Sequence, residues 1–96
     1  MNNLKLVFTL ILLSIPISTI AGQAEYDECI LKHLKGAKLD MASITINQAC
    51  KENYRNPGFT PKSRRAYNEC LLEHLPGVES IQAAMLITAA CKNKNK

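Results

Sequence analysis

Several features that would indicate an enzyme or a membrane-spanning protein are missing from this chain of 96 residues. It has no CxxC motif, so a thiol–disulfide oxidoreductase is not indicated. It has no apolar run near the roughly 20 residues that a membrane-spanning helix needs. Aromatic residues make up 5% of the chain and are not interleaved with basic residues, which argues against a nucleic-acid-binding surface. No pair of carboxylates stands out as general acid and base, so we expect no catalytic residues and no enzymatic activity.

The first 21 residues have the order of a secretory signal peptide. Lys5 gives the start a positive charge, residues 6–15 form an apolar run of about ten, and small residues end at Ala21. We therefore predict cleavage after Ala21 and a protein that is periplasmic or secreted. An uncleaved anchor is the alternative. No cysteine lies near the predicted cleavage point, so a lipid-modified N-terminus is not expected.

The rest of the chain contains one unit twice. Residues 26–51 align without gaps with residues 67–92, at an offset of 41. Both units begin with Tyr-x-x-Cys, contain a glycine at the same place and end in Ala-Cys-Lys. A repeat of this length indicates that each unit is one supersecondary element that buries its apolar face against a neighbour.

Each unit is predicted to be a helical hairpin. Apolar residues recur every three or four positions both before and after the shared glycine, as on one face of a helix. Gly36 and Gly77 stand where a helix end favours the left-handed conformation, and Asp40 and Ser80 can cap the second helices. The fold class is therefore predicted as all-α: two disulfide-stapled helical hairpins packed as a small four-helix domain over residues 22–96.

Residues 53–60 are predicted to be a connector between the hairpins. Asn56-Pro57-Gly58 is typical of a turn. Thr60-Pro61 is typical of an N-cap followed by proline at the first helical position. The third helix is therefore predicted over residues 61–75.

The cysteines are predicted to form two disulfides, because export leads to an oxidising compartment and the mature chain has only about 75 residues. Four cysteines allow three pairings. In a hairpin, Cys29 lies roughly 10 Å before the turn and Cys50 roughly 15 Å after it, at 1.5 Å per residue, which brings them level to within about one helical turn. The alanines beside Cys50 and Cys91 allow the close approach that a disulfide requires. We therefore predict Cys29–Cys50 and Cys70–Cys91.

The repeated pattern resembles a known family. Tyr-x-x-Cys-[Ile/Leu]-Leu, then Gly, then Ala-x-x-x-Ile-x-x-Ala-Cys-Lys is similar to the duplicated motif of small exported bacterial four-cysteine proteins. The resemblance covers nearly all of the predicted mature chain. It implies a compact helical disulfide protein in the periplasm or outside the cell, and it carries no catalytic residues across.

Two histidines repeat at matching positions and are the only metal candidates. His33 and His74 each follow a cysteine on one helix face, and this set has ligand types that zinc or copper accepts. With the cysteines oxidised, however, each histidine is better placed to meet the carbonyls and dipole at its helix end. We therefore predict no cofactor and no metal site.

Basic residues gather around the connector. The formal charge of +4 falls to about +3 once Lys5 is removed, and much of it lies on Arg55, Lys62, Arg64 and Arg65. This cluster is either a patch for an anionic partner or a solvated charged edge.

The last helix is apolar nearly all round between residues 81 and 90. Such a helix is central in a core, covered by a protein partner or a second copy, or inserted in a membrane. Met85 and Leu86 lie on a different side from Cys91 and are the candidate partner interface.

These features lead to one functional hypothesis and two alternatives. We expect a non-enzymatic exported binding module of the cell envelope, with an unknown protein partner or a homodimer. The alternatives are a membrane-active or lipid-binding helical protein and a metal-binding protein that uses the Cys/His pairs. A nucleic-acid partner is not favoured.

Overall fold

The computed structural model describes residues 22–95, and within them it contains helices and turns but no strand. The all-α prediction is therefore confirmed. The predicted signal peptide, residues 1–21, lies outside the described residues. In chain order the helices are the first helix (residues 22–33) with the 3-10 turn Leu34–Gly36, then α2 (Asp40–Cys50), α3 (Lys62–His74) and α4 (Ile81–Lys94).

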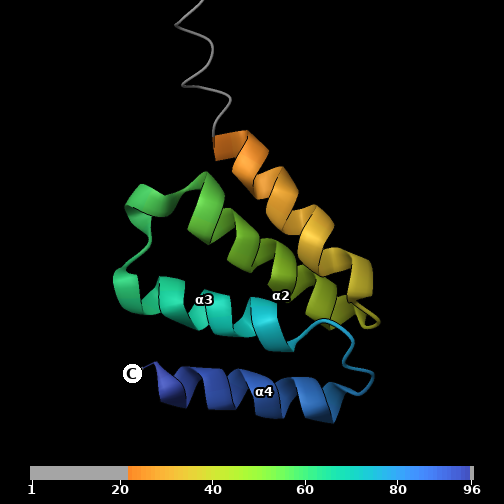
Figure 1. Cartoon of the computed structure of the whole chain (residues 1–96). Coiled ribbons are helices and arrows are strands. Elements are labelled where there is room, and N and C mark those ends of the chain that lie inside the picture. The colour runs from red at the N-terminus through yellow and green to blue at the C-terminus, as the bar shows by residue number, and fades with distance from the viewer. Residues whose placement is uncertain (1–21, 96) are drawn as a thin grey trace, which may run out of the picture.

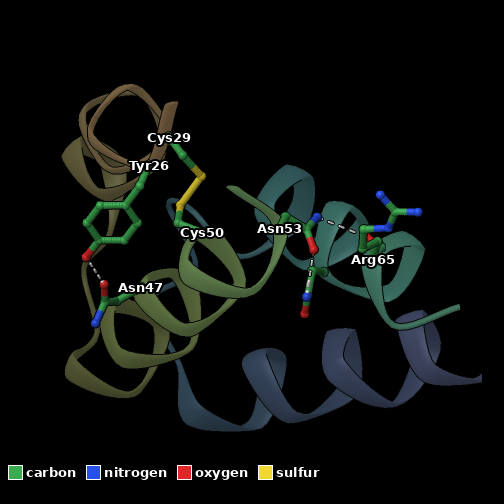
Figure 2. The surroundings of a disulfide bond; sticks show 7 residues. Tyr26, Cys29, Asn47, Cys50, Asn53 and Arg65 are labelled. Atoms are coloured by element: carbon green, nitrogen blue, oxygen red, sulfur yellow. Dashed lines mark hydrogen bonds between the residues drawn. A yellow bond between two sulfur atoms is a disulfide. The ribbon is translucent and has the colours of Figure 1, made fainter. Parts of the chain in front are cut away.

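Each hairpin is closed by the predicted disulfide. Cys29 bonds to Cys50 between the first helix and α2 (Figure 2), and Cys70 bonds to Cys91 between α3 and α4. The Cα atoms are 5.7 Å apart in both bridges. All four sulfurs belong to the buried core, so the two staples also fill the space between the helices of each unit.

The four helices lie side by side in chain order, from the first helix at one end to α4 at the other (Figure 1). The middle of the row is the contact between α2 of the first unit and α3 of the second. Ile46, Leu71 and Leu75 are fully buried there and form the core with the cysteines. Burial of these large aliphatic side chains, together with the disulfides, stabilises the joint between the units.

The turns of the two hairpins meet at equivalent positions. The backbone N–H of Gly77 donates to the carbonyl of Gly36 at 2.8 Å, and the Lys38 ammonium donates to Glu79 at 2.9 Å. In both pairs a residue contacts its own counterpart 41 positions later. A two-fold axis would also bring α4 against the first helix, yet these two lie at opposite ends of the row (Figure 1). The units therefore stack in the same direction, as in solenoid repeat proteins.

Three of the predicted helix caps, Gly36, Asp40 and Thr60, are wrong. Gly77 adopts the left-handed conformation with φ +87°, but Gly36 lies in a 3-10 turn and has no positive φ. A Cβ on Gly36 would lie 3.6 Å from Pro76, an ordinary van der Waals distance, so this turn lies against the second hairpin. Ser80 caps α4 as predicted, by accepting from the N–H of Ala83 at 3.1 Å. Asp40 is instead the first residue of α2, after Leu39 and without a side-chain cap.

The predicted connector is more structured than its composition suggests. α2 continues into a π-helical turn over Lys51–Arg55, and a 3-10 turn follows over Pro57–Phe59. The hydroxyl of Thr60 donates to the carbonyls of Glu52 and Asn56 and does not cap the next helix. Thr60 therefore ties the connector back to the π-helical turn.

Candidate interaction surfaces

A polar cluster joins the two units where α2 runs into the π-helical turn. The carboxylate of Glu52 accepts from Arg64 Nε at 2.8 Å, Asn68 Nδ2 at 2.9 Å and Gln48 Nε2 at 2.9 Å. The hydrogen bond from Arg64, followed by those from Asn68 and Gln48, lowers the pKa of Glu52 to about 2, although burial opposes the shift. At neutral pH the carboxylate of Glu52 is therefore ionised, and its oxygens are already hydrogen-bonded within the contact between the two units. It is not free to bind a ligand.

The buried part of this cluster is a pair of asparagines. Asn68 Nδ2 donates to Asn53 Oδ1 at 2.9 Å, and Asn53 Nδ2 donates to the carbonyl of Arg65 at 3.1 Å (Figure 2). Both asparagines are buried, and no buried side-chain nitrogen or oxygen among residues 22–95 lacks a partner. Because buried polar groups are costly unless hydrogen-bonded, this pair fixes how the second unit sits on the first.

The basic residues near the connector do not form one free patch. The guanidinium of Arg64 bonds to Glu52 and lies 5.0 Å from the centre of the Tyr67 ring. That of Arg55 lies 5.3 Å from the centre of the Tyr26 ring. Lys62 and Arg65 are exposed. Two of the four cations are thus engaged within the chain, and an anionic partner stays a prediction.

The two histidines occupy different surroundings although they are repeat equivalents. His33 is half-buried, and burial, with a smaller contribution from Lys32, lowers its pKa, while a hydrogen bond with the backbone of Leu72 opposes this shift. His74 is exposed, with Nε2 3.8 Å from a carboxylate oxygen of Glu73.

A metal site would need more ligands than the histidines supply. All four cysteines are in disulfides and have no thiolate to offer. In the part of the chain that the structure describes, no group of three His, Cys, Asp or Glu residues is placed to hold a metal ion.

α4 presents large apolar side chains at one end of the row. Ile81, Met85 and Leu86 are 60%, 61% and 64% exposed. Only Ala84 and Cys91 of this helix are buried, both toward the rest of the chain. The central core position, one of three alternatives for this helix, is therefore wrong. No helix between residues 22 and 95 has the length and apolar character needed to cross a bilayer.

The first helix presents an apolar side chain at the opposite end. Leu31 is 74% exposed, and its neighbour on that side, Asp27, is exposed as well. The two helices at the ends of the row (Figure 1) thus both carry exposed apolar side chains.

Comparison with known proteins found a family that is described by its four cysteines. A family model described as "Four-cysteine protein VF_A0006-like" matches residues 7–95, which include all four cysteines. The chain belongs to this family of four-cysteine proteins. No curated protein and no solved structure matches it. The family description names the cysteines and no activity, so the function has to be argued from the surface of the molecule.

Sequence reasoning missed two residues of interest in this four-cysteine protein. Glu52 was not singled out, because two of its three partners, Arg64 and Asn68, come from a helix that begins ten residues later along the chain. Leu31 was not singled out either, although the repeat held a signal for it. Units that stack in one direction leave one face of the first helix and one face of the last helix without a neighbour.

Proposed function

We propose that the chain is a non-enzymatic interaction module exported to the bacterial cell envelope, in the periplasm or outside the cell, and that it binds protein through the exposed face of α4. One observation carries this proposal: Ile81, Met85 and Leu86 lie on one helix and are each more than half exposed. Contiguous large apolar side chains on a small domain are typical of a contact surface. Two disulfides suit an oxidising location outside the cytoplasm.

A protein partner is favoured over a lipid surface by the way α4 is built. A helix that lies in a membrane interface combines an apolar face with a strongly charged one. The side of α4 opposite its exposed residues is occupied by Ala84 and Cys91, which pack into the chain itself. Its lysines, Lys92 and Lys94, are confined to the last turn. The exposed face is therefore a limited apolar patch on a rigid domain, which matches the core of a protein–protein interface.

Photo-crosslinking in intact cells tests this proposal. The full chain is expressed with a benzoylphenylalanine in place of Leu86, and in a control chain in place of Lys62, which is exposed at the start of α3. We expect light-dependent protein adducts from position 86 and none from position 62. Equal labelling at both positions would contradict the proposal. Binding of the oxidised protein to anionic vesicles that Leu86→Asp abolishes would also contradict it, in favour of the lipid-binding alternative.

A further inference from the structure

The same helix face is buried in the first unit and open in the second. On α2 and the turn after it, Ala42, Ile46, Ala49 and Asn53 are buried, and their spacing puts them on one face. Their counterparts 41 positions later are more accessible without exception: Ala83 and Ile87 are half-buried, and Ala90 and Lys94 are exposed. The burial differs because α2 is covered by α3, whereas within residues 22–95 no further helix lies against the corresponding face of α4.

The first helices of the two units show the reverse relation. On α3 and at its C-cap, the residues buried where the second unit meets the first are Asn68, Leu71, Leu72 and Leu75. The counterparts on the first helix are all more accessible: Asp27 and Leu31 are exposed, and Ile30 and Leu34 are half-buried. Leu72 is 4% exposed and its counterpart Leu31 is 74% exposed. The two open ends of the row are thus the two halves of the joint that is closed inside the chain.

We infer that a second copy of this chain, bound head to tail, covers the α4 face that carries Ala83, Ile87, Ala90 and Lys94. Leu86 lies at the edge of this face, since its counterpart Thr45 is half-buried beside α3. In this arrangement α4 of one copy packs on the first helix of the next copy, in the way that α2 packs on α3.

The inference goes beyond the proposed function, because the contact shares only Leu86 with the proposed protein-binding surface. Ile81 and Met85 correspond to Asp40 and Ile44, which stay exposed where α3 covers α2. Terminal units of stacked repeats normally carry a polar outer face that stops the stack. Here Leu86 and Leu31 stand on the outer faces instead.

Charged and polar residues at the two ends are complementary in this arrangement. Inside the chain, Asn53 bonds to Asn68 in the buried contact between the units. At the junction between copies their counterparts are Lys94 of one copy and Asp27 of the next copy, which have opposite charges. The Lys38–Glu79 ion pair between turns is continued by Glu79 of one copy and Lys38 of the next copy. Like charges do not meet at either place, and complementary charges set register at protein interfaces.

The exposed histidine also gains a partner. Inside the chain His33 is half-buried beside the backbone of Leu72. Its counterpart His74 is exposed, and at the junction between copies it lies opposite the backbone of Leu31, the counterpart of Leu72. Because the two faces differ, the contact is heterologous. Such contacts add one copy after another and give either a closed ring or an open filament.

Two end-blocking variants test the inference. Leu86→Asp closes the α4 end, and Leu31→Asp closes the first-helix end; both side chains are mostly exposed, so the disulfides and the fold are retained. Exported, oxidised protein is studied by sedimentation velocity over a range of concentrations. Wild type is expected to form larger species as the concentration rises, each variant alone is expected to be monomeric, and a one-to-one mixture is expected to give dimers and nothing larger.

Other outcomes overturn the inference. If Leu31→Asp associates like wild type and the mixture forms no dimer, the contact joins two α4 faces and is not head to tail. If wild type stays monomeric at every concentration, no second copy binds; adducts from position 86 with another protein would then leave the proposed function standing.

A charge exchange tests the register of the contact. Asp27→Lys or Lys94→Glu alone is expected to weaken association by more than roughly tenfold, since each change puts two like charges where the joint inside the chain buries Asn53 and Asn68. The double variant Asp27→Lys/Lys94→Glu is expected to recover it. Failure of the double variant to recover association would contradict the predicted pairing of these two residues.

Discussion

Replacement of Cys70 and Cys91 by alanine is expected to lower the free energy of unfolding by about 3 kcal/mol. Each disulfide joins residues 21 positions apart, and the loss of chain entropy in the unfolded state grows with the length of the loop that is closed. The core of so small a domain supplies only about 3–5 kcal/mol by itself. The net free energy of unfolding is what remains of these contributions after the entropy cost of ordering the chain is subtracted. Loss of one disulfide therefore removes most of it.

The first disulfide provides the comparison. Replacement of Cys29 and Cys50 by alanine is expected to cost a similar amount, because the loop has the same length and the sulfurs are equally part of the core. Urea denaturation followed by far-UV circular dichroism measures both variants, and reduced wild type shows the loss of both bridges together. Full helicity of the reduced protein, with an unfolding midpoint near that of the oxidised protein, would show that the staples do not hold the fold.

Leu72→Ala is expected to destabilise the monomer by about 2–5 kcal/mol, whereas Leu31→Ala is expected to change its stability by no more than about 0.5 kcal/mol. The two leucines are equivalent in the repeat, but Leu72 is 4% exposed in the joint and Leu31 is 74% exposed at the end of the row. Truncation of Leu72 leaves a cavity beside the core, while truncation of Leu31 removes methyl groups that already meet water.

This pair of variants is a matched control, since the residue type and the position in the repeat are shared. Urea denaturation is carried out at a concentration where the protein is monomeric, so that association does not add to the stability of wild type. Equal losses from both variants would contradict the assignment of one leucine to the joint and the other to an open end.

The sequence was sufficient for the helical hairpins and the disulfide pairing. Tyr26, Cys29 and Ile30 recur on the same helix face as Tyr67, Cys70 and Leu71, and a gapless repeat gives both units the same geometry. Such predictions depend on contacts within one unit, at short distances along the chain. The cap at Ser80 was predictable for the same reason, because its partner Ala83 lies three residues away.

Other predictions failed because a contact crosses from one unit to the other. Gly36 looks like a helix cap, but its carbonyl accepts from Gly77 of the second hairpin and the turn takes a different shape. The π-helical turn at Lys51–Arg55 places Asn53 against α3, where it bonds to Arg65 and Asn68. Local propensity contains no information about these partners.

The position of the last helix illustrates the same limit for the candidate surface. Its composition left a core, a partner or a membrane as alternatives. The structure excludes the core, because α4 ends the row and leaves Met85 and Leu86 exposed. Only the arrangement of the units shows that Leu31 belongs to the matching open face.

Amide hydrogen exchange of oxidised wild type at low and high protein concentration tests most directly whether the two open ends cover each other. Association stabilises the helices that it covers against opening and slows their exchange. Exchange is expected to slow together in α4 and in the first helix, residues 22–33, while α2 and α3 change little because α3 already covers α2. Slowing in α4 alone, or no change in either end helix, would contradict head-to-tail stacking of this repeat.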